Sequence, residues 1–301
     1  MKTVIEVMNL YKSYGKKKVL KGISFNVRRG EVFTLIGPNG SGKTTIMEIL
    51  EGVRTYNSGS FTILGKNTGD REVREKIGVA IQDSHSLSHL RVSELLAMYS
   101  KLYTRTLPLE EVIRSVHLTG KERQMVRNLS GGEKQLLNIA VAIVHDPQIV
   151  FLDEPSTGLD PEARRRLWSS MGILKEQGKT ILLTTHNMEE AELLSDRVAI
   201  LKDGILRSLG SPEDLLKEAG MNKRIDFEFN ESEDGIISIL QDRFQLKKGH
   251  AGSYSIFTMN VEDDMKYFLS ITSSAGISIR SLSIHVPDLE DVYFVCTGGE
   301  G

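Results

Sequence analysis

The sequence GPNGSGKTT at residues 37–45 restricts the possible folds of this chain more than any other feature. It follows the apolar, β-branched run EVFTLI at 31–36 and begins a helical pattern at 43–52. A glycine-rich turn between a buried strand and a helix directs successive backbone N–H groups to one point, where the helix dipole adds partial positive charge. This order predicts a phosphate-binding P-loop in a layered α/β fold.

The P-loop pattern also predicts roles for individual residues. We expect Lys43 to bridge the β- and γ-phosphates of ATP and the Thr44 hydroxyl to bind Mg²⁺. The alternative is a glycine-rich turn that only caps a helix, and the strand that precedes the turn argues against it. The predicted phosphate-binding residues are Gly37, Pro38, Asn39, Gly40, Ser41, Gly42, Lys43, Thr44 and Thr45.

An acidic pair, Asp153 and Glu154, ends a second apolar run at 149–153. An aspartate in this place is suited to hold Mg²⁺ through water, opposite the P-loop hydroxyl. The glutamate would accept a proton from the water that attacks the γ-phosphorus. A pair that merely caps a strand is the alternative, which the P-loop in the same chain disfavours.

Hydrophobic patterning predicts the rest of a core domain over residues 1–220. Short apolar runs rich in β-branched residues are typical of parallel strands that are buried on both faces. Alternating residues instead predict a small antiparallel sheet, and a long helical pattern at 92–145 predicts an inserted helical subdomain. The parallel strands are expected at 31–36, 149–153 and 180–185, the helices after them at 43–52, 161–177 and 187–195, and the antiparallel strands at 3–10, 19–27 and 60–64.

A change of pattern near Ser211-Pro212 predicts a second domain over residues 221–301, a small C-terminal α+β unit. A short helix at 212–219 ends at Gly220 and precedes it. The expected order is compatible with a ferredoxin-like unit. Its predicted elements are a strand around 225–229, a helix face at Ile236, Ile237 and Leu240, a strand at 252–260, a helix at 261–273, a strand at 277–286 and a helix at 288–296.

The sequence LSGGE at 129–133 permits two interpretations. Ser130 and Glu133 have the spacing of a capping box, which would start a helix. The adjacent glycines, Gly131 and Gly132, also leave room for a phosphate to approach. Both interpretations stay open on the residues alone.

Together, GPNGSGKTT, LSGGE and the sequence VFLDEP at 150–155 resemble the ATP-binding subunit of ABC transporters, over about two thirds of the chain. The resemblance implies that Ser130, Gly131 and Gly132 contact the γ-phosphate of an ATP that a partner subunit holds, so that two chains enclose two ATP molecules. The family usually has arginine where this chain has Leu136.

Four more positions carry roles that the resemblance implies. Gln82 corresponds to a glutamine that reaches Mg²⁺ or the attacking water, and His186 to a histidine that hydrogen-bonds the γ-phosphate. Asp160, in STGLD at 156–160, corresponds to an aspartate that crosses to the other subunit. Tyr14 corresponds to an aromatic residue on which adenine stacks. With Glu154 and Lys43, the residues Gln82 and His186 complete the expected catalytic set.

The ending, DLEDVYFVCTG at 288–298, resembles the closing segment of ATPases that serve ABC-2-type exporters. The resemblance implies an ATP-hydrolysing subunit that powers an exporter. The alternatives are an importer ATPase, a soluble ABC ATPase that acts on ribosomes or DNA, and a nucleotide-binding regulator without turnover. An amphipathic helix that only seals the small domain would give the same pattern.

Composition and charge limit the classes of partner that the chain is expected to bind. The net charge of −2 gives no basic footprint for nucleic acid, and the single cysteine fits a reducing compartment. No apolar stretch approaches the roughly 18 residues of a membrane-spanning helix. We therefore expect a homodimer or heterodimer of ATPase subunits, bound peripherally at the cytoplasmic face of the cell membrane through a separate multi-span permease.

Overall fold

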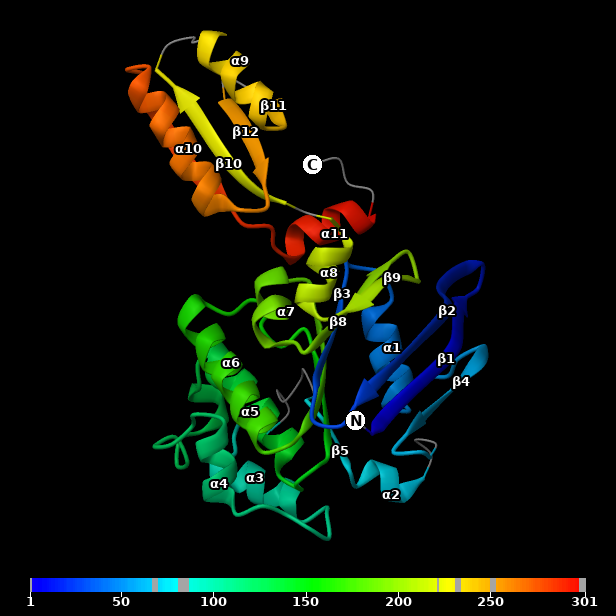
Figure 1. The fold of residues 1–301 in the computed structure, drawn as a ribbon. Coiled ribbons are helices and arrows are strands. Elements are labelled where there is room, and N and C mark those ends of the chain that lie inside the picture. The colour runs from blue at the N-terminus through cyan, green and yellow to red at the C-terminus, as the bar shows by residue number, and fades with distance from the viewer. Residues whose placement is uncertain are drawn as a thin grey trace. The chain divides into compact units, whose positions relative to one another are not determined.

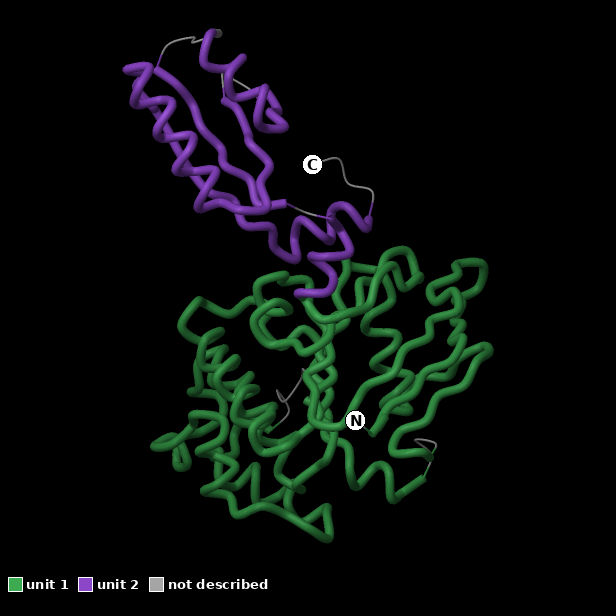
Figure 2. Tube along the Cα trace, in the orientation of Figure 1, with its two compact units in different colours: residues 1–212 green, residues 213–301 purple. Residues whose placement is uncertain are grey.

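The computed structural model describes residues 2–66, 70–80, 87–220, 222–230, 234–249 and 253–297. The chain forms two compact units, residues 1–212 and residues 213–301 (Figure 2). The boundary between the units lies after Pro212, the first residue of helix α8 (Pro212–Glu218). The sequence predicted a boundary after Gly220.

A six-stranded sheet forms the centre of unit 1, in the order β5-β6-β7-β3-β8-β9 (Figure 1). All pairs are parallel except the last, β8 with β9. Every residue of β3 and β7 is buried, which explains their unbroken apolar and β-branched sequences. The strands are β3 (Val32–Ile36), β5 (Ile77–Val79), β6 (Ile149–Asp153), β7 (Thr180–Thr185), β8 (Arg197–Lys202) and β9 (Ile205–Gly210).

The three predicted parallel strands are confirmed, and β5, β8 and β9 are additional. β8 and β9 form a hairpin whose turn, Asp203 and Gly204, has positive φ at both residues. Asp-Gly is the turn sequence that such hairpins favour. The parallel part of the sheet places the carboxyl ends of β3, β6 and β7 along one edge.

Helices follow the strands in the predicted places. α1 (Lys43–Leu50) follows β3, α6 (Pro161–Glu176) follows β6, and α7 (Met188–Leu194) follows β7. The helical subdomain is also present, and its apolar residues share one core with α6 and the sheet. It consists of α3 (Val92–Ser100), α4 (Leu109–Ser115), a 3-10 turn (Val126–Asn128) and α5 (Gly131–Ile143), while α2 (Arg71–Arg74) precedes β5.

The predicted antiparallel sheet is confirmed, in the order β2-β1-β4. Its strands are β1 (Thr3–Tyr14), β2 (Lys17–Arg28) and β4 (Ser58–Ile63). Residues that alternate along β1, among them Ile5 and Val7, are buried in the core that also receives α1. The alternation of apolar and polar residues in the sequence thus corresponds to an alternation of buried and exposed side chains along the strand.

Unit 2 has the β-α-β-β-α-β order of a ferredoxin-like unit, with an antiparallel sheet in the order β11-β12-β10-β13. Phe227 and Phe268 lie at the centre of its apolar core. The elements are β10 (Lys223–Phe229), α9 (Asp234–Arg243), β11 (Leu246–Lys248), β12 (Ser253–Thr258), α10 (Val261–Ser274), β13 (Ile279–His285) and a final helix α11 (Leu289–Thr297). No helix among the described residues has the length and apolarity to cross a membrane.

Candidate active site

The P-loop connects β3 to α1 and leaves the start of that helix open. Gly42 is the N-cap residue, with φ of 113°, and no side chain caps the helix or adds an acid to its first turn. The first N–H groups of α1 therefore keep their hydrogen-bonding capacity for an anion. A Cβ at Gly37 would lie 2.2 Å from the Leu201 carbonyl oxygen, so this turn requires glycine.

Lys43 points its ammonium group into the protein, and its side chain is only 5% exposed. The Nζ atom donates to the Gly37 carbonyl at 2.7 Å and lies 3.1 Å from Glu154 Oε1. A buried ammonium needs such anionic or carbonyl partners to offset its lost hydration. The structure thus brings Lys43 and Glu154, which are 111 positions apart in the sequence (154 − 43), into one ion pair.

Glu154 is held in an uncommon conformation directly after β6. Its φ is 48°, a left-handed value that costs a non-glycine residue free energy. The backbone N–H of Glu154 donates to the Thr184 carbonyl at 3.1 Å and to the Thr184 hydroxyl at 3.0 Å, which fixes the turn against β7. The carboxylate then extends between Lys43 and His186, whose Nδ1 atom lies 2.5 Å from Glu154 Oε2.

This environment keeps Glu154 ionised at neutral pH. Burial raises the pKa of Glu154, but the charge and hydrogen bonds of Lys43 and His186 outweigh burial, so the pKa lies below its ordinary value. An ionised carboxylate can accept a proton. His186 is 55% exposed, so one side of the pair is open to solvent.

Of the three residues predicted to hold Mg²⁺, Thr44 and Asp153 have the oxygen donors that suit that ion, and Gln82 lies outside the described residues. Asp153 accepts a hydrogen bond from the Thr184 hydroxyl, and Thr44 is exposed in the first turn of α1. Burial is the main cause that raises the pKa of Glu51 to about 7, and the negative charges of Asp153 and Glu48 add to it. Among the described residues no group of three or more His, Cys, Asp or Glu side chains is arranged so that it could hold a metal ion by itself. Mg²⁺ would therefore take most ligands from phosphate and water, as it commonly does.

The signature residues form a second cluster. Ser130 is the N-cap of α5: its hydroxyl accepts from the Glu133 N–H at 3.2 Å, and Glu133 Oε2 accepts from the Ser130 N–H at 2.9 Å. The capping box is therefore present. A Cβ at Gly132 would lie 2.5 Å from Ala163 Cβ, so this glycine is required by the packing of α5 on α6. Gly131 is exposed and has open space around it.

Asp160 lies beside the signature. Its carboxylate caps α6 by accepting from the Glu162 and Ala163 N–H groups at 3.0 and 2.9 Å. Ser130, Gly132 and Asp160 line one hollow of about 130 Å³, and no P-loop residue lines it. One chain therefore carries two groups of predicted site residues, one around Lys43 and Glu154 and the other around Ser130 and Asp160.

Three further predicted positions have different outcomes. Tyr14, at the end of β1, is 42% exposed, and the Lys12 ammonium and Arg54 guanidinium lie 5.1 and 5.3 Å from its ring centroid. Leu136 is 2% exposed and belongs to the apolar core beneath the signature. Gln82 lies outside the described residues.

Several polar residues that support this site could not be assigned a role from the sequence. Thr184 and Thr185 are both fully buried, and the first of them holds Glu154 and Asp153 in place. Glu190 is fully buried on α7. The two threonines at the end of the apolar run TILLTT are a signal that could have been recognised, whereas neighbouring glutamates on a helix do not show which one faces inward.

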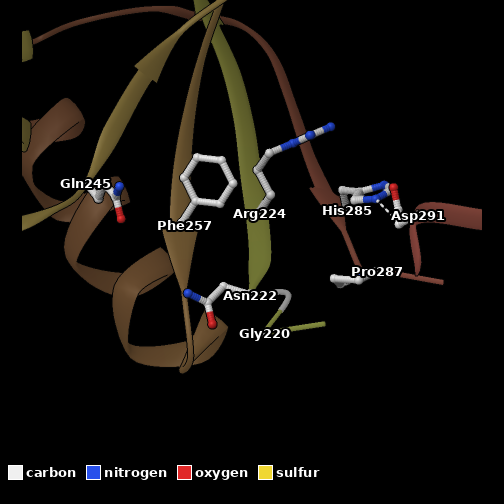
Figure 3. Close-up of a pocket in the computed structure, with 8 residues that line it drawn as sticks. All are labelled: Gly220, Asn222, Arg224, Gln245, Phe257, His285, Pro287 and Asp291. Carbon is white, nitrogen blue, oxygen red and sulfur yellow. Dashed lines mark hydrogen bonds and ion pairs between the residues drawn. The ribbon is translucent and has the colours of Figure 1, made fainter. Parts of the chain in front are cut away.

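Unit 2 contains a hollow of its own, of about 310 Å³ (Figure 3). Its charged residues already have partners within the unit: Arg224 Nε lies 2.8 Å from Asp226, and His285 Nε2 lies 2.8 Å from Asp291. The remaining lining residues are Gly220, Asn222, Gln245, Phe257 and Pro287. The charged side chains of this hollow therefore pair with residues of the same unit, and the hollow lacks the uncapped helix N-terminus that the P-loop site has.

Taken together, the fold and the site define a class: a P-loop ATPase with an inserted helical subdomain and an LSGGE signature. Residues 20–157 match the ABC transporter family. The chain is 36% identical to the Nod factor export ATP-binding protein I of Rhizobium sp. (strain N33), over 99% of this chain and 98% of that protein. It is 30% identical to the linearmycin resistance ATP-binding protein LnrL of Bacillus subtilis (strain 168), over 98% of each.

Solved structures show the same cassette. CbiO1 from Clostridium perfringens, part of the ABC transporter complex cbiONQ, superposes with a TM-score of 0.65 and 25% identity, covering 81% of this chain and 96% of that one. The chain therefore belongs to the ABC transporter family, as an ATP-hydrolysing subunit of the exporter type.

Proposed function

We propose that this chain binds ATP with Mg²⁺, hydrolyses it at a dimer interface and drives export through a separate membrane-spanning permease. The position of Glu154 between Lys43 and His186 is the observation that carries the proposal. The names of the relatives support export, and the membership of CbiO1 in a transporter complex supports a permease partner. The chain would act peripherally at the cytoplasmic face of the membrane, without nucleic acid.

The P-loop would hold the triphosphate. The open N–H groups at the start of α1 match phosphate oxygens, and the Lys43 ammonium would exchange the Gly37 carbonyl and Glu154 carboxylate for the β- and γ-phosphates. Tyr14 would stack on adenine with its exposed ring. Thr44 and Asp153 would hold Mg²⁺, which offsets negative charge on the phosphates when bound.

Glu154 would act as the general base. The lowered pKa of Glu154 favours the ionised carboxylate, and movement of Lys43 toward phosphate would free a carboxylate oxygen for water. The water oxygen forms a bond to the γ-phosphorus, the bond to the β–γ bridging oxygen breaks, and the water proton passes to Glu154. His186 orients the carboxylate through Nδ1 and would hydrogen-bond the γ-phosphate. Gln82 would orient the water.

The second group of site residues supports a dimer. Ser130, Gly131, Gly132 and Asp160 would face the γ-phosphate bound by the partner, as identical subunits or as a heterodimer. Gly131 leaves open space for this approach, and the hollow that contains Ser130 and Asp160 has no P-loop residue in its lining. Each reaction centre would thus need two chains.

Glu154→Gln tests the general base. We expect turnover to fall by about 10²- to 10⁴-fold, because the amide cannot accept the proton, while ATP binding persists and an ATP-bound dimer accumulates. Glu176→Gln, an exposed change near the end of α6, is the control and should hydrolyse ATP like the wild type. Turnover in Glu154→Gln that equals the control would contradict the role of Glu154.

Dilution tests the shared site independently of the base. If two chains complete each centre, the ATPase rate per milligram should fall as the protein is diluted below its dimerisation constant. Sedimentation at the same concentrations gives the monomer fraction. A constant specific rate among monomers would show that one chain is sufficient.

A further inference from the structure

Glu190 places a carboxylate in the interior of unit 1. The residue lies on α7, four positions after His186, and is 0% exposed. Its backbone N–H donates to the side chain of the N-cap residue Asn187 at 3.1 Å, which fixes the first turn of the helix. Its neighbour Glu189 is instead 70% exposed. A carboxylate buried to this degree is costly unless donors surround it.

Three donors from three segments surround this carboxylate. The Trp168 indole Nε1, on α6, donates to Oε1 at 2.9 Å, and the Ser156 hydroxyl donates to Oε2 at 3.0 Å. The Thr185 hydroxyl, at the end of β7, is a third donor that favours the charged carboxylate, although burial outweighs the donors and leaves the pKa of Glu190 raised. Trp168 and Thr185 are 9% and 0% exposed, so water does not compete for these bonds. An indole can only donate, which requires an acceptor at that place.

Two of these donors adjoin the reacting residues. Ser156 follows Glu154 by two positions, and Thr185 immediately precedes His186. Glu190 therefore ties together the two backbone segments that carry the Glu154–His186 pair. The same tie holds the start of STGLD, the segment that ends at Asp160.

We propose that Glu190 is a positioning residue for ATP hydrolysis, which sets the separation of Glu154 and His186 by holding Ser156 and Thr185. The inference rests on the proposed function, since it assigns those two residues to the reaction. Trp168 is the third partner and anchors the carboxylate to α6, so its loss should affect stability more than chemistry. The three hydrogen bonds thus divide into two that position the reaction and one that supports the fold.

Glu190→Gln is the first variant. The amide keeps the shape of the side chain, but one of its two polar atoms becomes a donor that faces other donors. We expect kcat to fall by roughly 10- to 100-fold with little change in KM for ATP, because small displacements of reacting groups slow the reaction without weakening phosphate binding. Glu189→Gln, the exposed neighbour with the same change of charge, is the matched control.

Partner variants separate positioning from folding. Ser156→Ala and Thr185→Val each remove a donor from a reacting segment, and both should lower the kcat of the folded protein in addition to any decrease in Tm. Trp168→Phe removes the donor on α6 and should lower Tm while kcat of the folded protein stays near that of the wild type. Trp168 is the only tryptophan of the chain, so its fluorescence reports whether the surroundings of Glu190 are intact in the other variants.

The double variant Ser156→Ala with Glu190→Gln completes a cycle. Positioning predicts that its kcat is close to that of the worse single variant, because both changes break the same bond. Multiplied effects, or a kcat for folded Glu190→Gln equal to that of Glu189→Gln, would overturn the inference. If Glu190→Gln does not fold, kcat of Ser156→Ala is compared with kcat of Trp168→Phe. A lower kcat in Ser156→Ala supports positioning, and equal kcat values overturn it. A wild type without ATPase activity would instead overturn the proposed function.

Discussion

The two units of the chain bury polar groups to different extents. In unit 1 the buried residues include Lys43, Thr184, Thr185 and Glu190, all of which lie at or near the carboxyl ends of central strands. In the described part of unit 2 the buried polar side chains are Thr258 and Thr272. The Thr272 hydroxyl donates to the Phe268 carbonyl one turn earlier in the same helix.

This difference in buried polar groups distinguishes unit 1, which contains the candidate active site, from unit 2, which is held together mainly by apolar packing. Lys43, Thr184 and Glu190 lose hydration on burial, and specific hydrogen-bond partners offset that loss. Glu154 adds backbone strain to that cost. Unit 2 is stabilised mainly by its apolar core and shows no comparable concentration among its described residues. The comparison predicts that changes in unit 1 alter ATP chemistry and that changes in unit 2 alter stability.

The largest expected effect is that of Lys43→Ala. It removes the ammonium proposed to bind the phosphates and leaves Glu154 without its partner at 3.1 Å. We expect ATP affinity to fall by at least about 100-fold, since each lost charge-assisted contact to phosphate contributes roughly 1.5–3 kcal/mol. Isothermal titration with ATP and Mg²⁺ measures this. Lys175→Ala breaks a half-exposed ion pair with Asp196 and should leave affinity unchanged.

The next largest effect tests unit 2. Phe227 is 1% exposed, and its ring centroid lies 4.6 Å from that of Phe268. Phe227→Ala should lower the free energy of unfolding of unit 2 by about 3–5 kcal/mol, because it leaves a cavity in the core. Hydrogen exchange of the amides in β10 and β12 reports on this unit alone. Phe294→Ala, at a residue that is 44% exposed, is the control.

The same variant tests the comparison itself. If unit 2 acts as a scaffold, the ATP affinity of folded Phe227→Ala should equal that of the wild type. An affinity that falls as far as in Lys43→Ala would show that unit 2 shapes the nucleotide site. The division between chemistry and stability would then be wrong.

A smaller effect is expected at Tyr14. Tyr14→Ala removes the exposed ring proposed to stack on adenine and should raise KM for ATP by roughly 5- to 30-fold, for a stacking contribution of about 1–2 kcal/mol. Tyr14→Phe should restore most of the affinity because it keeps the ring. Tyr11→Ala is a matched control on the same strand, with 44% exposure against 42% for Tyr14. Equal KM values for the Tyr14→Ala and Tyr11→Ala proteins would contradict stacking.

The sequence was informative wherever function coincides with the end of a strand. Lys43, Glu154 and His186 follow apolar runs whose burial is predictable, so their convergence at one sheet edge could be expected. The LSGGE segment was harder. Its capping box was predicted from spacing, but the contact that makes glycine necessary at Gly132 involves Ala163 on another helix.

Glu190 could not be predicted because helical periodicity alone leaves Glu189, Glu190 and Glu192 in α7 indistinguishable as polar residues. Only the positions of Trp168 and Ser156 show which of them faces inward. The order of the strands in unit 2 also could not be predicted. The sequence predicted the helices and strands, but the fold depends on the pairing of β10 with both β12 and β13.

The smallest expected effect is a pH dependence confined to unit 1. His145 is 3% exposed, stacks on Tyr103 with ring centroids 3.9 Å apart, and donates through Nε2–H to the Ile77 carbonyl at 2.9 Å. Burial, the largest influence, lowers the pKa of His145 below 6.5. The unfolded chain therefore binds a proton at a higher pH than the native protein does. Stability is full above about pH 6.5 and decreases as the pH falls toward the native pKa.

His145→Phe should remove this part of the acid sensitivity, because it keeps a stacking ring without a titrating group. The measurement is the free energy of unfolding by urea at several pH values between 5 and 8, for His145→Phe and for His89→Gln, an exposed control. Hydrogen exchange of the amides in β10 and β12 over the same pH range gives the acid sensitivity of unit 2 for comparison. Equal acid sensitivity of His145→Phe and the control would show that burial of this imidazole does not distinguish unit 1.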